Sequence, residues 1–336
     1  MDQDRLGGLH SPKPMLAGQR VLVTGGAGFV GSHLTEALLD AGAQVAVFDN
    51  GSTGQWRFLD GAYEQYPGKL RQCRGHLSDT ELLCAAMSGS DLVIHLAANA
   101  DIRHGVEYPD RDFEQNLGGT QIVLRMMHQL GIKRIAFAST GAVYGDNTSF
   151  KINEACPFPV QNSFYGASKV AAEALISAYA AAFDMQTYIF RFVPMVGERY
   201  SHGHIFDFVK KLRNDPDRVE VFGTGQERKY CLYVRDAMQA VCVGVEQGDL
   251  PVNIFNVGNN SSYTISEVLD WVAHDMQVEP GIVFTGRRWT GDNPNMHLDS
   301  ARMRALGWYP KLSLREAVHR TVSYLLDNPW LLARDS

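Results

Sequence analysis

The sequence predicts an α/β protein with a doubly wound parallel sheet and a smaller C-terminal α/β lobe. From residue 20 onward, short apolar and β-branched runs alternate with longer segments of helical period, which is the pattern of strand–helix–strand units in a parallel sheet. The runs are also almost wholly apolar. A strand that helices cover on both faces has this composition, whereas a strand with one solvated face alternates between apolar and polar residues.

Up to about residue 193, the expected strands alternate with segments of helical period. The strands cover 20–24, 44–48, 91–96, 134–139 and 187–192, and the helices cover 29–41, 80–88, 110–130 and 165–183. Beyond residue 193 the alternation is less regular, with further helices expected at 235–246, 264–275 and 313–327. We interpret this second part as a smaller lobe over the ends of the sheet.

Composition and charge favour a protein that binds a small soluble ligand. Hydrophobic residues make up 45% of the chain and aromatic residues 10%, which is enough apolar surface to offset the entropy lost on folding. The formal net charge of -6 argues against nucleic acid as a partner, because phosphate contacts require a basic face.

Cysteine usage and the absence of long apolar runs favour a cytoplasmic protein. The five cysteines are odd in number and form no CxxC pair, so we expect reduced thiols, no disulfide framework and no zinc site. Residues 1–18 lack the apolar run of a signal peptide and are expected to form a flexible tail. No stretch approaches about 18 uninterrupted apolar residues, so no membrane partner is expected.

A glycine-rich turn joins the first strand to the first helix. Gly25, Gly28 and Gly31 fall three residues apart in the segment TGGAGFVG. Such a turn needs residues without a Cβ, because its backbone approaches a pyrophosphate closely and the helix N-terminus donates N–H groups to that anion. A glycine pattern alone also fits an ordinary turn, but here a strand precedes it and a helix follows it. We therefore predict a dinucleotide site.

Asp49 narrows the dinucleotide to NAD. It lies at the end of the second strand, 18 residues after Gly31 (49 − 31), and Asn50 follows it. A carboxylate at this place accepts hydrogen bonds from the ribose diol and repels a 2′-phosphate. The sequence therefore predicts NAD rather than NADP.

Tyr165 and Lys169 begin the helix expected at 165–183. At i, i+4 spacing their side chains share one helical face, so the ammonium stands near the phenol. A free phenol has a pKa of about 10, and a nearby cation together with a positive nicotinamide would lower it enough to provide a phenolate base. A Tyr–Lys pair also arises by chance. The segment STGAVYG favours the functional interpretation, because it lies at the carboxyl end of a strand, where ligands bind in open α/β sheets.

Taken together, these segments resemble one enzyme family. TGGAGFVG, FDN, HLAA, Asn116, STGAVYG, YGASK and YVRD are similar to motifs of the extended short-chain dehydrogenase/reductases that act on nucleotide sugars, and among these to the UDP-sugar 4-epimerases. The resemblance covers about residues 19–325. It implies a Rossmann-type NAD-binding domain over 19–192, to which segments near 229–258 return, and a substrate-binding lobe made of 193–228 and 259–330.

The resemblance implies a hydride-transfer cycle that uses NAD and no metal. Tyr165 would take the proton of the sugar 4-hydroxyl while C4 passes a hydride to NAD, and the 4-ketose would turn and take the hydride back on its other face. Lys169 would bind the nicotinamide ribose, and Thr140 would share the substrate hydrogen bond. The implied cofactor contacts are Gly25, Gly28, Phe29, Val30, Gly31, Asp49, Asn50, Leu77, Leu96, Ala97, Ala98, Asn116, Tyr165 and Lys169.

The two residues after Thr140 narrow the reaction. Dehydratase relatives carry Asp-Glu there and decarboxylating relatives usually keep a Glu, but this chain has Gly141 and Ala142. Acid–base elimination lacks its titratable groups in that case. We therefore expect 4-epimerisation of a UDP-hexose or UDP-hexuronate. Uronate decarboxylation, 3,5-epimerisation and a non-catalytic NAD-binding protein are the alternatives, and the joint presence of Thr140, Tyr165 and Lys169 argues against the last.

Substrate contacts are expected from the lobe as well as from the Tyr–Lys helix. The positions that the resemblance assigns to the substrate are Thr140, Tyr165, Arg228, Arg288 and Asp292. Arg199 is a further candidate for a phosphate or a carboxylate, with a solvated loop arginine as the alternative. His202 and His204 have a spacing found in metal sites but lack a carboxylate or thiolate partner nearby, so no metal is expected.

Two positions and one loop depart from the family pattern. The loop GRRWTGD, which contains Arg288 and Asp292, is one residue longer than the phosphate clamp of the family. His76 stands where the family has an Asp at the adenine ring, and Pro194 replaces an Asn that would touch the sugar nucleotide. Met296 occupies the position related to acceptance of an N-acetyl group, but its middling size decides nothing.

The resemblance also implies a homodimer. Helices near 110–130 and 165–183 would form a four-helix bundle across a two-fold axis. The apolar faces of these helices are consistent with this arrangement, but equally with burial inside one subunit.

Overall fold

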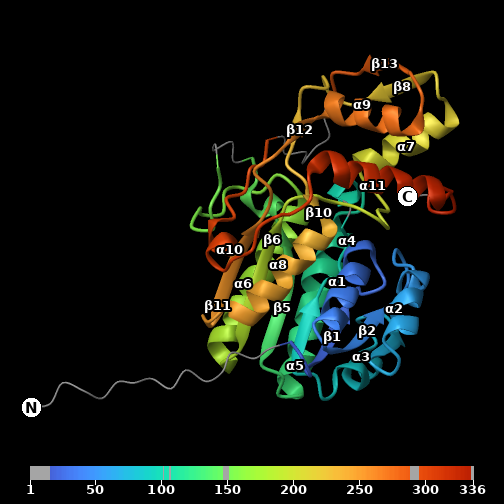
Figure 1. The fold of residues 1–336 in the computed structure, drawn as a ribbon. Coiled ribbons are helices and arrows are strands. Elements are labelled where there is room, and N and C mark those ends of the chain that lie inside the picture. The colour runs from blue at the N-terminus through green and yellow to red at the C-terminus, as the bar shows by residue number, and fades with distance from the viewer. Residues whose placement is uncertain (1–15, 101, 106, 147–150, 288–294, 334–336) are drawn as a thin grey trace, which may run out of the picture.

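A computed structural model describes residues 16–100, 102–105, 107–146, 151–287 and 295–333. Within them a seven-stranded sheet in the order β11-β6-β5-β4-β1-β2-β3 forms the centre of the larger part of the molecule (Figure 1). All of its neighbouring strands pair in parallel. The strands are Arg20–Thr24 (β1), Gln44–Asp49 (β2), Leu70–Arg74 (β3), Leu92–His95 (β4), Arg134–Thr140 (β5), Gln186–Phe192 (β6) and Val252–Val257 (β11). The predicted Rossmann-type fold is confirmed.

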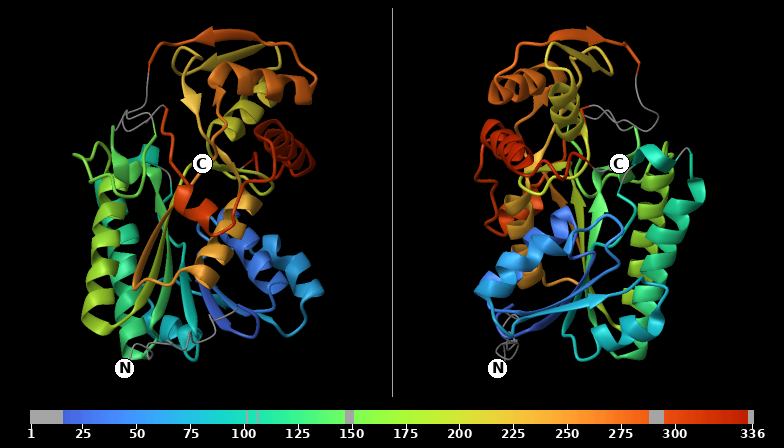
Figure 2. Two further views of the ribbon diagram at one scale, coloured as in Figure 1. Left: turned by 60° about the vertical axis from the view of Figure 1, so that its left-hand side comes forward. Right: turned by 90° about the vertical axis from the view of Figure 1, so that its right-hand side faces the viewer.

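Helices cover both faces of this sheet (Figure 2). Val21 and Val23 of β1 pack into one apolar cluster, while Leu22 between them packs into another on the opposite face. Neighbouring strand residues point to opposite faces, so a strand with two covered faces is apolar throughout. The helices of the first face are Phe29–Asp40 (α1) and Val234–Gln247 (α8), and those of the second are Thr80–Met87 (α3), Gly119–Gln129 (α5) and Phe164–Phe183 (α6).

The two edge strands, β3 and β11, lack the unbroken apolar run that predicts the inner strands. An edge strand has a neighbour on one side only, so it tolerates polar residues that break the apolar run. β3 is only partly buried. In β11, Asn253 and Asn256 are buried because their side chains are hydrogen-bonded, Asn253 to the Leu250 carbonyl at 2.6 Å and Asn256 to the Ile152 carbonyl at 2.9 Å.

A smaller lobe lies over the carboxyl ends of the strands (Figure 1). Its helices pack around a separate apolar cluster that includes Val209, Val268 and Val322. The helices are His204–Asn214 (α7), Ile265–Met276 (α9) and Leu314–Asp327 (α11). The short strands are Met195–Val196 (β7), Arg218–Val221 (β8), Arg228–Lys229 (β9), Leu232–Tyr233 (β10), Tyr263–Thr264 (β12) and Gly281–Phe284 (β13), paired as β7·β10, β8·β13 and β9·β12.

Residues from two segments that were not assigned to the main domain contact its core. In the segment expected as a tail, Leu16 is 1% exposed in the sheet's core and the Gly18 N–H donates to the Gly42 carbonyl at 3.0 Å. In the segment 259–330, expected in the lobe, Met303 and Trp308, in and after Ala301–Ala305 (α10), pack into the core of the main sheet.

The helix expected at 110–130 forms as three consecutive segments. They are Pro109–Asp112 (α4), the π-helical turn Phe113–Gly118 (η3) and α5. Asn116 lies in the π-helical turn, a feature that often accompanies functional sites. No helix in the described part of the chain is long and apolar enough to cross a membrane.

Candidate functional site

The glycine-rich turn lies between the carboxyl ends of β1 and β4. Strand order diverges at this pair, and ligands of open α/β sheets bind at such a switch point. Gly25 has a φ of 71°, and a Cβ there would lie 2.8 Å from the Ala97 backbone nitrogen. A Cβ on Gly31 would lie 2.1 Å from the Gly25 carbonyl oxygen. Glycine at these positions is therefore a steric requirement of the turn.

The turn places the N-terminus of α1 at this edge of the sheet. Gly28 is the N-cap residue in extended conformation, and no side chain within the described residues caps α1. The first helical residues, Phe29, Val30 and Gly31, have no preceding helical carbonyls to accept from their N–H groups, which suits an anion. These observations fit the pyrophosphate of a dinucleotide.

Asp49 ends β2 beside this turn and is 8% exposed. Its carboxylate accepts from the Ala27 N–H at 3.0 Å and from the Gly51 N–H at 2.7 Å. Burial raises the pKa of Asp49, which these two backbone hydrogen bonds oppose. Each carboxylate oxygen accepts more than one hydrogen bond, so the fixed carboxylate can still receive a ribose diol. Asn50 turns to accept from the Ser52 N–H at 2.9 Å.

The loop after β4 lies beside the glycine-rich turn, to which it is hydrogen-bonded. The Leu96 N–H donates to the Thr24 carbonyl at 3.1 Å, and the Ala97 N–H donates to the Thr24 hydroxyl at 3.3 Å. Leu96, Ala97 and Ala98 are all partly buried there. Leu77 is more remote in the sequence but packs at the start of α5, where a Cβ on Gly119 would lie 3.0 Å from it.

Tyr165 and Thr140 meet at the carboxyl end of β5. Ser163 caps α6 by accepting from the Gly166 N–H at 3.0 Å, which fixes the first turn that carries Tyr165. The Thr140 side chain lies near the phenol and favours its ionised form, while its hydroxyl accepts from the Ala142 N–H at 3.1 Å. Burial raises the pKa of Tyr165 to about 12, Thr140 opposes this, and the charge of Asp112 adds to it. The protein alone therefore keeps the phenol protonated.

Lys169 lies one helical turn further along α6 and is 3% exposed. Its Nζ donates to the Ala138 carbonyl at 2.9 Å and lies 5.9 Å from the centroid of the Tyr165 ring. Burial lowers the pKa of Lys169 to about 8, while Glu173 and Asp112 raise it. The ammonium is thus held near the phenol, as the i, i+4 spacing predicts.

Two acidic residues that the sequence analysis missed support this pair. Glu173, again i+4 from Lys169, forms a buried ion pair with Arg191 at 2.6 Å and accepts from Ser139. Asp112 is 1% exposed and accepts from Asn99 at 2.9 Å and Asn116 at 3.1 Å. The i, i+4 spacing is a sequence signal for Glu173. Nothing in the sequence distinguishes Asp112, because only the fold brings it to Lys169.

Asn116 is hydrogen-bonded to several segments of the site. Its amide nitrogen donates to Asp112 and to the Ser168 hydroxyl at 3.0 Å, and its amide oxygen accepts from the Asn99 N–H at 2.8 Å. Its backbone carbonyl accepts from the Thr120 hydroxyl at 2.6 Å. Asn116 therefore ties the loop after β4 to the π-helical turn and to α6.

His95, at the end of β4, is buried between two threonines. One ring nitrogen lies 2.7 Å from the Thr24 hydroxyl and the other lies 3.2 Å from the Thr120 hydroxyl. Burial lowers the pKa of His95 to about 3, and the charge of Lys169 adds to this. His95 is therefore neutral at pH 7 in the folded protein.

This burial predicts loss of stability in acid. An unfolded histidine binds a proton below about pH 6.5, so unfolding takes up a proton at His95 between pH 6.5 and about 3, and the free energy of unfolding falls as the pH is lowered. When the pH is lowered from 7 to 5, the free energy of unfolding of His95→Asn should fall by about 2 kcal/mol less than that of the parent. Urea denaturation at the two pH values measures this difference. The exposed His128→Asn is the control. Equal losses in His95→Asn and the parent would contradict the prediction.

The expected substrate residues are only partly brought together. Asn295 donates its backbone N–H to the Arg228 carbonyl at 3.1 Å. The next residue, Met296, packs on Gly141, where an added Cβ would lie 2.2 Å from the Met296 sulfur. Arg228 thus lies on a strand joined to the segment beside Thr140. Its exposed guanidinium donates to the Ser262 hydroxyl at 3.2 Å. Arg288 and Asp292 lie outside the described residues.

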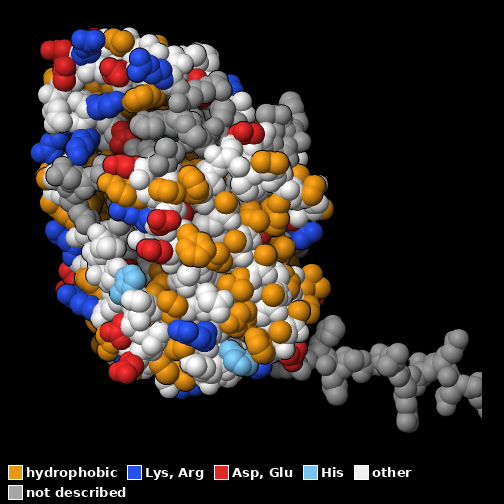
Figure 3. Space-filling model, turned by 180° about the vertical axis from the view of Figure 1, so that it is seen from behind, with side chains coloured by type: hydrophobic (Ala, Val, Ile, Leu, Met, Phe, Trp, Pro, Cys, Tyr) orange, Lys and Arg blue, Asp and Glu red, His pale blue; other side chains and the backbone are white. Residues whose placement is uncertain are grey.

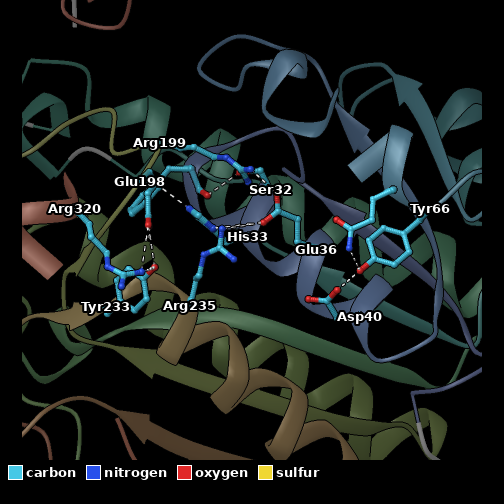
Figure 4. Close-up of polar contacts among 12 residues, drawn as sticks. Ser32, His33, Glu36, Asp40, Tyr66, Glu198, Arg199, Tyr233, Arg235 and Arg320 are labelled. Carbon is cyan, nitrogen blue, oxygen red and sulfur yellow. Dashed lines mark hydrogen bonds and ion pairs between the residues drawn. The ribbon is translucent and has the colours of Figure 1, made fainter. Parts of the chain in front are cut away.

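Arg199 belongs to an ion cluster between the lobe and α1 (Figure 4). It has a φ of 66° and pairs with Glu36, which also lies 3.5 Å from Arg235. The backbone carbonyl of Glu198 lies 2.9 Å from a ring nitrogen of His33 on the same helix α1. These contacts hold the lobe against α1 and engage one nitrogen of the Arg199 guanidinium.

The two histidines with metal-like spacing have other partners. His204 lies 2.7 Å from the Tyr263 hydroxyl, and His202 stacks on Tyr200 with ring centroids 6.3 Å apart. Among the residues that the structure describes, no group of three or more His, Cys, Asp or Glu side chains is placed to hold a metal ion.

The fold and site define a dinucleotide-binding fold with a Tyr–Lys pair at the carboxyl edge of the sheet. Comparisons with known proteins agree. The model of the NAD dependent epimerase/dehydratase family matches residues 21–258. A putative UDP-glucose 4-epimerase of Methanocaldococcus jannaschii is 29% identical over 318 residues, covering 92% of this chain and 99% of that protein.

Solved structures give the same result. The crystal structure of a UDP-galactose 4-epimerase has a TM-score of 0.82 at 34% identity, covering 93% of this chain and 100% of that one. MoeE5 in complex with UDP-glucuronic acid and NAD has a TM-score of 0.81 at 26% identity, covering 92% and 99%. The chain belongs to the NAD dependent epimerase/dehydratase family, which confirms the resemblance seen in the sequence, and its cofactor is NAD.

Proposed function

We propose that the protein catalyses the NAD-dependent 4-epimerisation of a nucleotide sugar, a hexose or hexuronate carried on UDP. The observation that carries the proposal is the position of Tyr165, which follows the carboxyl end of β5 near Thr140 and has the Lys169 Nζ 5.9 Å from its ring centroid. A base, a hydroxyl partner and a cation are what reversible oxidation of a secondary alcohol requires.

Each residue of the site has a definable task. The glycine-rich turn and Asp49 would hold NAD, which would supply the acceptor and donor of the C4 hydride. Tyr165 removes the proton of the 4-hydroxyl and later gives it back, and Thr140 holds the substrate oxygen. Lys169 binds the nicotinamide ribose. Because burial holds the pKa of Tyr165 at about 12 in the protein alone, the phenol needs a further positive charge to ionise near neutral pH, and oxidised NAD carries one.

The surroundings of Thr140 support epimerisation over elimination. Gly141 and Ala142 have no titratable side chain. The structure adds a steric reason, since the Met296 sulfur occupies the space that a side chain on Gly141 would enter. A carboxyl group at Gly141, where dehydratases carry one, would have to displace Met296.

Product analysis tests the proposal. UDP-glucose, UDP-N-acetylglucosamine and UDP-glucuronate would each be incubated with the holoenzyme and followed by proton NMR, with absorbance recorded in the reduced-nicotinamide band. The expected product is the 4-epimer of at least one substrate. A UDP-pentose with released CO₂ would favour decarboxylation instead. No product and no absorbance change with any substrate would leave a non-catalytic NAD-binding protein.

We also propose a homodimer through α5 and α6. Figure 3 views this helix layer, where hydrophobic side chains gather. Lys169 and Glu173 are the charged residues of α6, and both are buried. Its outer face carries exposed alanines, while Phe164 is 52% exposed and Phe113 of the adjoining π-helical turn is 63% exposed. A solvent-facing helix without charge is typical of an interface.

A single charge should break this dimer. Ala174 is exposed on the outer face of α6, so Ala174→Glu would bury an unpaired carboxylate in the interface. Light scattering after size exclusion should give about twice 37.2 kDa for the parent and 37.2 kDa for the variant. Ala305→Glu, at an exposed position of α10, is the control. A monomeric parent would refute the dimer.

A further inference from the structure

The C-terminal end of the lobe packs on the segment that follows the cofactor strand β2. Trp330 lies just beyond α11, and the centroid of its ring is 4.1 Å from Arg57 Cζ and 5.9 Å from the centroid of Phe58. Both contacts fall on the 3₁₀ turn Trp56–Leu59 (η1). Leu331 and Leu332 are buried in the same apolar cluster as Phe58. The last described residues of the chain therefore hold η1 in place.

The loop Gly51–Gln55, just before η1, lies directly on the glycine-rich turn. The Gln55 N–H donates to the Ala27 carbonyl at 2.7 Å. A Cβ on Gly54 would lie 2.9 Å from the Ala27 carbonyl carbon and 3.1 Å from the Asp49 carboxylate. Movement of η1 would therefore move the backbone that covers Asp49.

The lobe makes further contacts around the same point. Phe29, the first residue of α1, belongs to the apolar cluster that contains Leu331 and Leu332. Arg199 lies 5.8 Å from the centroid of Phe58 while its guanidinium pairs with Glu36 of α1 (Figure 4). The first residue of α1 and the 3₁₀ turn η1 are thus both packed against the lobe.

We propose that Trp330 is a positioning residue, which fixes the loop Gly51–Gln55 over the ribose of bound NAD and so slows release of the cofactor. The inference rests on the proposed cofactor site at Asp49. It suits the proposed reaction, because an epimerase returns the hydride that it removes, and loss of the cofactor between the two transfers would end the cycle. Trp330 itself need not touch NAD.

The rate of NAD release tests this inference without using turnover. Holoenzyme would be loaded with radiolabelled NAD and chased with excess unlabelled NAD, and the label retained by the protein would be followed over time. Trp330→Ala removes the cation–π contact with Arg57 and the tilted ring contact with Phe58, and should release NAD about tenfold faster. Arg57→Gln removes the exposed cation alone, leaves the packing of Trp330, and should accelerate release roughly threefold.

Trp271→Ala is the matched control. Trp271 is also a partly buried lobe tryptophan, with Arg315 Cζ 6.0 Å from its ring centroid, but it lies on α9. It should release NAD at the parent rate. Parent-like release by Trp330→Ala, or equal acceleration by Trp271→Ala, would overturn the inference. If Trp330→Ala does not fold, unchanged release by Arg57→Gln overturns it. A parent that holds NAD but converts no nucleotide sugar would refute the proposed reaction alone.

Discussion

Tyr165→Phe is expected to lower turnover roughly 10²- to 10⁴-fold while NAD remains bound, since positioned acid–base groups contribute this much to catalysis. The substitution removes the hydroxyl and keeps the ring in the first turn of α6. Lys169 still donates to the Ala138 carbonyl, so the cofactor side of the site is unchanged. Steady-state rates on the substrate found by NMR, together with the NAD content of the purified variant, measure both parts of the expectation.

Tyr179→Phe is the control for this experiment. Tyr179 lies on the same helix, and its hydroxyl accepts from Gln121 at 3.1 Å on the surface. Removal of that hydroxyl should leave turnover near the parent value. If Tyr165→Phe keeps more than about a tenth of the parent rate, the phenol is not the base, and the proposed mechanism fails.

Gly31→Ala is expected to reduce the NAD content of the purified protein at least about tenfold. The new Cβ would stand 2.1 Å from the Gly25 carbonyl oxygen and 2.6 Å from Gly26 Cα, both of which are backbone atoms. The turn has to open to relieve this overlap, and forcing one extra carbon into a packed site typically costs about 1–3 kcal/mol. NAD released by denaturation and quantified per mole of protein gives the occupancy.

Gly61→Ala separates this effect from a general effect of losing glycine. Gly61 lies in the helix Asp60–Gln65 (α2), and an added Cβ there meets no atom within 4 Å among the described residues. Alanine should stabilise that helix by roughly 0.5–1 kcal/mol and leave the NAD content unchanged. Full occupancy in Gly31→Ala would show that α1 does not receive the dinucleotide as proposed.

The sequence predicted the central strands and helices well because both faces of the sheet are covered. A buried parallel strand must be apolar along its whole length, and this leaves a local signal that needs no knowledge of its neighbours. β3 and β11 lacked that signal, since an edge strand takes polar residues on its free side. Leu16 was assigned to the tail for a similar reason, because a single apolar residue has no period from which its burial can be read.

The residues of the site also fall into two groups, those that a local sequence pattern predicts and those that only the fold brings together. Gly25, Gly31 and Asp49 are recognisable in the sequence because the turn between a strand and a helix is local, and so is the i, i+4 relation of Tyr165 and Lys169. Other features of the site join residues far apart in the chain. They are the effect of the Asp112 carboxylate on Lys169, the packing of Met296 on Gly141 and the contact of Trp330 with Arg57.

The sequence by itself therefore determined the sheet, the dinucleotide turn and the Tyr–Lys pair, because each depends on residues within one or two turns of chain. Only the tertiary structure decided which groups set the pKa of that pair, what covers the position after Thr140, and that Arg199 pairs with Glu36 of α1. The physical reason is that burial and long-range charge depend on which segments pack together, and no local pattern records the identity of a neighbour.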